Sequence, residues 1–159
     1  MASEVTFAPA TVALARELAA DMCPEDEAEV VAGGQPDGLS ALLFSLRVSE
    51  VAVAMLVDGR VAAMFGIQPL EATTHLGQLQ RGLVWALTSR VSRKHPRAYM
   101  EHSRAVVKAL LSYCPDLSNY IDARHRQALR WARWMGFELG APVPLGPQGL
   151  PFIPFRARA

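Results

Sequence analysis

Short apolar segments separated by polar breaks predict one strand and three helices in the N-terminal third of the chain. The run 5–7 is rich in β-formers and predicts an opening strand. Apolar positions spaced by three and four residues then predict a helix from Pro9, an acidic helix from Pro24 to about Val31, and a third helix over 39–48. Proline fits a first helical turn because its missing N–H would have no partner there. Residues 1–50 are therefore expected to be mostly helical.

Two dense apolar runs, 51–56 and 61–67, flank the pair Asp58-Gly59 and predict a β-hairpin. This pair readily adopts the positive φ angles that a tight hairpin turn requires. Neither arm alternates with polar residues, so both are expected to be central strands covered on two faces.

The second half of the chain predicts two successive units of strand and helix. The run 82–87 predicts a strand, and a helix with apolar positions at spacings of 3, 4, 7 and 8 is expected from Pro96. The run 119–121 predicts another short strand, after which Asp122 is expected to cap a helix that ends at Gly136. The apolar face of this helix carries Ala128, Trp131, Ala132 and Met135. Its opposite face carries Arg126, Arg130 and Arg133. The Pro-rich segment 142–159 cannot be a regular helix, and it is expected to form either an edge strand or a docking arm.

This order of elements predicts an α/β fold in which helices flank a mixed central sheet. With 159 residues, a single domain over 1–159 is expected. No apolar run approaches the roughly 20 residues that span a bilayer, so we expect a non-exported protein without membrane contact. Cys23 and Cys114 lack CxxC spacing and are expected to be reduced, buried thiols. The histidines do not indicate a metal site.

Charge is distributed unevenly, although the net charge is only +1. Residues 1–40 hold eight acidic residues against one arginine, a balance of −7. Residues 90–133 hold ten lysines and arginines against three acidic residues, a balance of +7. The two regions can pair within the fold, can join copies head to tail, or can leave the basic face for an anion such as nucleic acid. The sequence leaves these alternatives open.

Several motifs in order resemble a known family. They are GLVWAL at 82–87, His-Pro-Arg at 95–97, NYIDAR at 119–124, a helix ending in Gly-Phe at 136–137, and GPQGLPF at 146–152. Together they resemble the last units of the GNAT superfamily of N-acetyltransferases, and in particular a phage branch that includes proteins labelled internal virion protein A. The resemblance implies a GNAT-like mixed sheet, a location in a virion or the host cytoplasm, and other virion proteins as partners.

The resemblance also implies where acetyl-coenzyme A would bind. In the superfamily, a glycine-containing loop after the corresponding strand holds the pyrophosphate with backbone N–H groups at a helix N-terminus. Here, the connection 88–97 contains no glycine. The cofactor-binding candidates are therefore side chains, namely Arg90, Arg93, Lys94, Arg97 and His125. This basic cluster can pair with one of three anions: coenzyme A, nucleic acid, or the chain's own acidic helices.

Catalytic residues are not identified from the sequence. Alignment on Gly136-Phe137 places His125 where the superfamily has asparagine and Ala132 where it has a tyrosine acid. The strand 82–87 carries no carboxylate for a general base, and the nearest is Glu71 in the connection that precedes this strand.

Three functions follow from these patterns. We expect first a phage-encoded virion-associated or assembly protein that keeps the acyltransferase scaffold with a degenerate cofactor loop. The alternative is an active acetyl-CoA-dependent N-acetyltransferase that holds the pyrophosphate with arginine side chains. The third is a nucleic-acid-binding module that uses the basic face. Whether the chain is an enzyme stays open at this point, because one scaffold hosts many functions.

Overall fold

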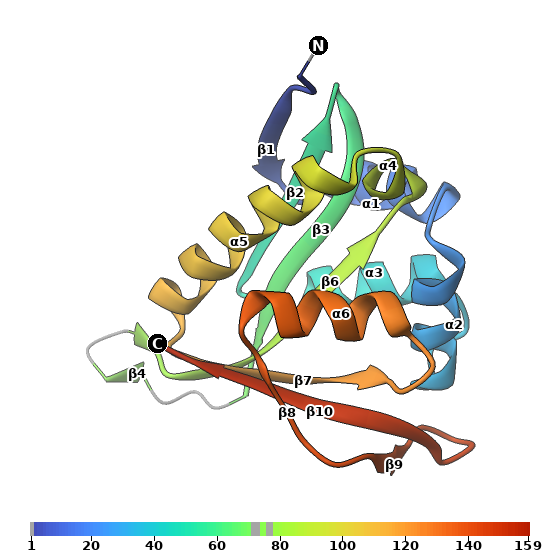
Figure 1. Ribbon diagram of the computed structural model, residues 1–159, viewed down its shortest axis with the longest axis vertical. Coiled ribbons are helices and arrows are strands. Elements are labelled where there is room, and N and C mark those ends of the chain that lie inside the picture. Colours follow the sequence, from blue (N-terminus) through green and yellow to red (C-terminus); the bar gives the residue numbers. More distant parts are fainter. Residues whose placement is uncertain (1, 71–73, 76–77) are drawn as a thin grey trace.

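Apolar runs that alternate with helical segments fold into one α/β domain in the computed structural model (Figure 1). The structure describes residues 2–70, 74–75 and 78–159. The strands are β1 (Val5–Pro9), β2 (Val51–Val57), β3 (Arg60–Pro69), β4 (Thr74–His75), β5 (Gln78–Leu79), β6 (Arg81–Thr88), β7 (Asp116–Asp122), β8 (Glu138–Leu139), β9 (Val143–Leu145) and β10 (Leu150–Arg158). The helices are α1 (Val12–Ala20), α2 (Pro24–Ala32), α3 (Gly38–Val48), α4 (Arg90–Lys94), α5 (Pro96–Tyr113) and α6 (Arg126–Met135).

The central sheet has the strand order β1-β2-β3-β6-β7-β10-β8, with β9 beside β10. All neighbours in this sheet are antiparallel except β6 and β7, which are parallel and are connected by α5. Helices α5 and α6 cover one face, α1 and α3 cover the other, and α2 lies beside the ends of β6 and β7 (Figure 1). The mixed sheet flanked by helices is thus confirmed.

Strand β3 explains why the hairpin arms lack polar alternation. Phe65 packs into the cluster under α5 and α6, whereas Met64 packs into the cluster under α1 and α3. Both side chains are fully buried. A central strand covered on two faces must be apolar on both. The turn at Asp58-Gly59 has positive φ angles of 50° and 80°, as the sequence predicts.

Two helix starts differ from the prediction, and local hydrogen bonds explain both. Helix α1 begins at Val12 rather than Pro9, because the Thr11 side chain accepts from the N–H of Leu14. Helix α6 is capped by His125 rather than Asp122, and His125 Nδ1 accepts from the N–H of Ala128 at 3.2 Å. The end of α6 at Gly136, with φ of 88°, is confirmed.

The predicted edge strand over 142–159 holds for only part of this segment, because β9 lies at the edge of the sheet and β10 does not. The segment forms β9 and β10, and β10 lies between β7 on one side and the short strands β8 and β9 on the other. Proline is tolerated here because its carbonyl still accepts: Pro151 O bonds Ala123 N at 3.0 Å, and Pro154 O bonds Gly140 N at 2.8 Å.

Other features of the fold bear on function. Cys23 and Cys114 are buried free thiols, as expected. Within the described residues, no group of three or more His, Cys, Asp or Glu side chains could hold a metal ion. In the same part of the chain, no helix is long and apolar enough to cross a membrane.

Candidate active site

An opening in the sheet lies between the parallel strands β6 and β7. These strands pair only over Arg81–Leu83 and Asp116–Ser118. Beyond these pairs they separate, and the side-chain amide of Asn119 donates to the carbonyl of Val84 at 2.8 Å. The separation leaves a cleft of about 720 Å³. Where two parallel strands separate at their carboxyl ends, the gap between them is a common place for a ligand to bind.

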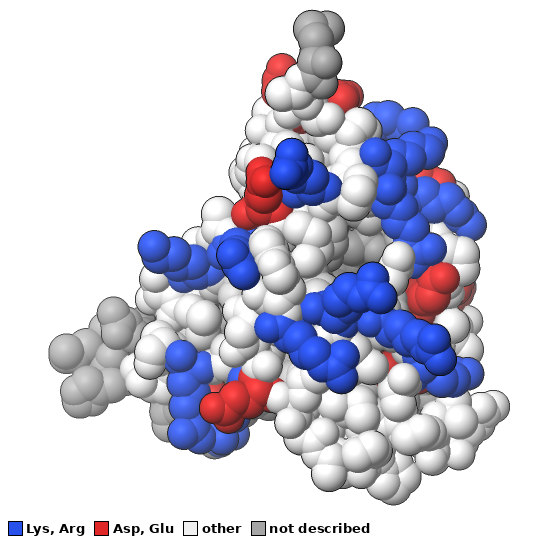
Figure 2. Space-filling view, in the orientation of Figure 1, with Lys and Arg blue, Asp and Glu red and all other residues white. Residues whose placement is uncertain are grey.

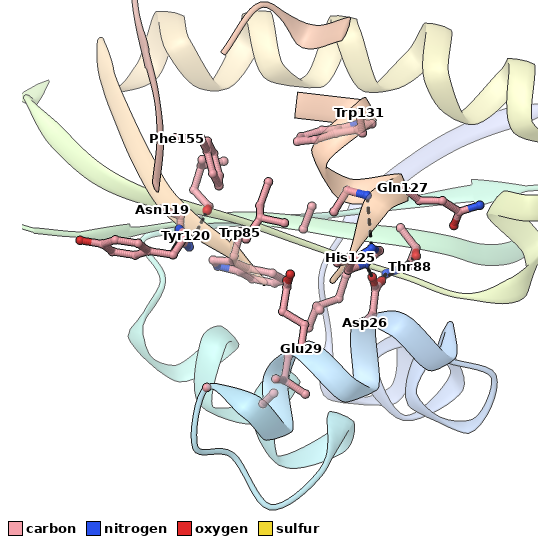
Figure 3. A pocket seen from close by; sticks show the side chains of 18 of the residues that line it. Asp26, Glu29, Trp85, Thr88, Asn119, Tyr120, His125, Gln127, Trp131 and Phe155 are labelled. Carbon is pink, nitrogen blue, oxygen red and sulfur yellow. Dashed lines mark hydrogen bonds and ion pairs between the residues drawn. The ribbon is translucent and has the colours of Figure 1, made fainter. Parts of the chain in front are cut away.

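The cleft is lined from both faces of the sheet. Trp131 and Phe155 line the face covered by α5 and α6, whereas Trp85 and Glu29 lie on the face covered by α2 and α3 (Figure 3). Phe44 of α3 adds a further ring on this second face. The walls are therefore largely apolar, with a few polar groups that converge from α2, β6 and α6.

A buried polar cluster ties α2 to β6 and α6 at the end of the cleft. Asp26 Oδ2 accepts from both the N–H and the hydroxyl of Thr88 at 2.6 Å. Asp26 Oδ1 lies 2.5 Å from His125 Nε2. Because His125 Nδ1 accepts from the N–H of Ala128, the neutral tautomer carries its proton on Nε2 and donates it to Asp26. Burial works against a charged imidazole, but the Asp26 carboxylate outweighs it and raises the pKa of His125.

Glu29 lies one helical turn beyond Asp26 on α2 and also lines the cleft. In the described part of the chain, its carboxylate accepts one hydrogen bond, from the N–H of Asp122 at 2.8 Å. Burial disfavours the charged form and raises the pKa of Glu29 to about 7, although the charge of His125 and the Asp122 amide partly offset this effect. A carboxylate that titrates near neutrality can accept a proton under physiological conditions.

Five successive backbone N–H groups at the start of the connection after β6 are already bonded within the protein. Thr88 N donates to Asp26 at 2.6 Å, Ser89 N to Ala62 O at 3.0 Å, Arg90 N to Asp21 O at 3.0 Å, Val91 N to Ser89 Oγ at 3.2 Å, and Ser92 N to Ser89 O at 3.1 Å. The short helix α4, which the sequence did not predict, occupies this connection. A pyrophosphate would have to displace these bonds, so side chains are left to hold it.

The five predicted cofactor-binding residues do not all meet in one place. Arg93 and His125 line the cleft, whereas Arg90, Lys94 and Arg97 do not. Arg90 pairs with Asp21 and Arg93 with Glu25, so part of the basic segment meets the acidic helices inside one chain. Arg97 pairs with Glu101 on its own helix.

Two further groups on α6 lie at the cleft. Arg130 lines it, and its guanidinium has no ion-pair partner in the part of the chain that the structure describes. Lysine and arginine side chains gather over α4 and α6 on either side of a hollow (Figure 2). Trp131 is only 9% exposed, and its indole N–H has no hydrogen-bond partner among the described residues. Such an orphaned donor is unusual in a buried position, and a ligand oxygen would satisfy it.

Sequence reasoning missed Asp26 and Glu29. Both belong to the acidic helix predicted from Pro24 to about Val31, and their spacing of three residues puts them on one helix face. That spacing was the available signal. Glu71, the carboxylate that the sequence did single out, lies outside the described residues.

Comparison with solved structures identifies the fold. An acetyltransferase of the GNAT family from Streptococcus pneumoniae has a TM-score of 0.62 and 11% identity, and the match covers 98% of this chain and 100% of that one. The aminoglycoside acetyltransferase AAC(6')-Ib in complex with ribostamycin and coenzyme A has a TM-score of 0.67 and 14% identity, with 97% and 93% covered. A protein from Acinetobacter baylyi ADP1 with a provisional acetyltransferase assignment has a TM-score of 0.69 and 10% identity, with 100% and 95% covered.

The chain has the GNAT acetyltransferase fold, as its sequence resemblance implies. No family model and no curated protein matches the sequence. The assignment to the phage branch has no support from these comparisons.

Proposed function

We propose that this protein is an acetyl-CoA-dependent N-acetyltransferase that holds the cofactor's phosphates with side chains instead of loop amides. Glu29 is the observation that carries the proposal. It places a carboxylate with a pKa of about 7 at a cleft between separating strands. Burying such a group costs stability, and a general base is the function that repays this cost.

Several groups that line the cleft fit coenzyme A. Beyond residue 83, the facing edges of β6 and β7 do not pair with each other, which leaves backbone groups for the amides of a ligand. The indole N–H of Trp131 is available to an oxygen acceptor. Arg130 at the cleft would hold the phosphates, since a cation replaces the loop amides that are already bonded.

In this function Glu29 prepares the acceptor amine. Its carboxylate takes a proton from the ammonium form of the acceptor, so that the nitrogen lone pair becomes available. When bound, acetyl-coenzyme A supplies the acetyl group: the acetyl C–S bond breaks, the carbon bonds to the nitrogen, and the thiol leaves with one of the two protons that the ammonium gives up. The Asp26–His125 pair keeps α2 in place, because it joins this helix to α6.

Calorimetric titration with acetyl-CoA at low and moderate salt tests the proposal. We expect a dissociation constant near or below the micromolar range that weakens with salt. Arg130→Glu should weaken binding at least tenfold, because it reverses a charge at the cleft. Arg133→Glu, on the same helix but outside the cleft lining, is the matched control and should bind nearly as the unmodified protein does. Absence of heat at millimolar ligand would refute the proposal.

A structural role in a phage particle is the second candidate, and one observation favours it. The five successive backbone donors of 88–92 are all bonded within the protein, which is what a scaffold without a cofactor would permit. Other virion proteins would then be the partners, and the virion or the host cytoplasm the location. Mass spectrometry of purified particles from cells that produce this protein would detect it at a fixed copy number. A protein absent from the particles would exclude this role.

A further inference from the structure

The half of the cleft that faces α2 and α3 is built differently from the half that faces α5 and α6. Phe44, Trp85 and Tyr120 contribute aromatic rings from three separate elements. Glu29 lines the same half, and Figure 3 shows it below Trp85, on the side of α2. Three rings and one carboxylate thus line this half, together with the polar side chains of Gln35, Ser45 and Gln68.

The position of Trp85 is fixed. Its indole N–H donates to Ser49 Oγ at 2.8 Å. Its ring lies against Gly66 on the neighbouring strand, where an added Cβ would come within 2.5 Å of the ring carbons. Only glycine at position 66 leaves room for the indole. The indole is therefore held in place before a ligand binds, and binding does not have to order it.

The charges around this half exclude acidic ligands. The cations that line the cleft are Arg93, His125 and Arg130. The first two are held by Glu25 and Asp26, and Arg130 stands on α6, across the sheet. A ligand carboxylate or phosphate beside Glu29 would therefore lose its hydration without gaining a counter-charge. An ammonium group gains both the carboxylate and the faces of the aromatic rings.

We propose that this half binds a primary amine attached to an aromatic or similarly apolar body and lacking any acidic group. The inference rests on the proposed function, in which this amine is the acetyl acceptor. Free amino acids are excluded by their carboxylate. Polycationic amines are disfavoured, because the described carboxylates that line the cleft are Asp26 and Glu29, and Asp26 is already held by His125, so additional ammonium groups would lack a counter-charge.

Two probes that differ by one carboxylate test this inference. 2-Phenylethylamine and phenylalanine share a ring and an amine, and spermidine supplies amines without a ring. Each is titrated calorimetrically into the protein, with and without coenzyme A, and acetyl transfer from acetyl-CoA is measured separately. We expect 2-phenylethylamine to bind at least tenfold more tightly than either of the others. Equal binding of phenylalanine or spermidine would overturn the inference.

Variants locate the binding. Trp85→Ala and Tyr120→Ala should each weaken binding of 2-phenylethylamine about fivefold or more, since each removes a ring face. Because Tyr120 is 43% exposed, the Tyr120→Ala variant should fold normally. It therefore tests the inference even if Trp85→Ala disrupts the fold. Trp134→Ala, which removes an indole outside the cleft lining, is the matched control and should bind as before. Unchanged binding in both cleft variants would place the amine elsewhere and overturn the inference.

The two proposals fail in different ways. A protein that binds acetyl-CoA but none of the amines would retain the proposed function and refute the inferred acceptor. A protein that binds 2-phenylethylamine selectively but not acetyl-CoA would support the amine site and refute the acetyltransferase.

Discussion

Two carboxylates one helical turn apart on α2 differ in their environments. Asp26 accepts two hydrogen bonds from Thr88 and one from His125. Glu29 accepts one from the N–H of Asp122 among the described residues, and it lines the cleft. The first carboxylate is therefore a structural anchor, whereas the second is left with a proton affinity suited to catalysis.

Glu29→Gln is expected to make the protein more stable at alkaline pH while abolishing most activity. The folded-state pKa of Glu29 is about 7, against 4.5 for the ordinary side chain. The folded protein thus holds this proton longer than the unfolded chain, and stability falls as pH rises from about 4.5 through 7. The full cost reaches about 3 kcal/mol.

Urea unfolding of both proteins at pH 5 and pH 8 measures this effect. Relative to the Gln variant, the unmodified protein should lose stability between the two values, because only it carries the titrating carboxyl. A difference between the two proteins that stays constant with pH would show that Glu29 has an ordinary pKa.

His125→Ala is expected to destabilise the fold by about 3 to 5 kcal/mol, because it strips a buried carboxylate of its imidazole partner. The raised pKa of His125 means that the charged imidazole adds stability at acidic pH, and that this part is lost as pH rises through the folded-state value. Unfolding measured at pH 6 and pH 9 should show a larger penalty at pH 6. The opposite order would contradict the assigned pair.

At the scale of elements, helix α6 carries two tryptophans, and the structure places them in different environments. Trp131 is 9% exposed and packs against Phe137 with ring centroids 5.8 Å apart. Trp134 is 37% exposed and lies under the guanidinium of Arg104, 3.6 Å from the ring centroid. The helical period places the first on the sheet and the second at the border of the basic face.

Trp131→Ala should lower the free energy of unfolding by about 3 to 5 kcal/mol, because it leaves a cavity in the main core. Trp134→Ala should cost about 1 kcal/mol or less, since it loses mainly a surface cation–π contact. Chemical denaturation of both variants gives the comparison. Equal losses would show that α6 is rotated relative to the sheet. Trp131→Phe, which keeps most of the packing, tests whether the indole N–H contributes to acetyl-CoA binding.

For the whole molecule, the charge polarity of the sequence is only partly resolved inside the fold. Arg90 and Arg93 pair with Asp21 and Glu25, which joins α4 to the acidic N-terminal helices. Lys94, Lys108, Arg126, Arg130 and Arg133 make no ion pair within the described residues. These cations leave a positive face over α4, α5 and α6 (Figure 2). Self-association and nucleic-acid binding through this face stay predictions, and both would weaken with salt.

Acetyl-CoA at a hundredfold excess over its dissociation constant should raise the melting temperature by about 5 to 10 °C. Ligand linkage adds about 2.7 kcal/mol at this excess, and a domain of this size gains roughly 2 to 4 °C per kcal/mol. Thermal unfolding followed by circular dichroism, with coenzyme A lacking the acetyl group as a second ligand, measures the shift. An unchanged melting temperature with both ligands would favour the role in a phage particle.

The sequence by itself determined the elements whose signals are local. The hairpin at Asp58-Gly59, the end of α6 at Gly136, and the apolar faces of the helices all depend on φ preferences or on spacing within a few residues. The order of these elements, together with the motifs, was sufficient for the GNAT fold. Short-range geometry can be read from a sequence because neighbouring residues impose it on one another.

Tertiary structure decided the site, because its contacts join residues that are distant in the chain. Asp26 and His125 are 99 positions apart, and Glu29 and Asp122 are separated by 93. The donors of 88–92 are bonded partly by Asp21, Asp26 and Ala62, which no local pattern reveals. The interior place of β10 likewise depends on β7 and β8 meeting it from both sides. Burial sets the pKa of Glu29, and burial is a property of the packed molecule alone.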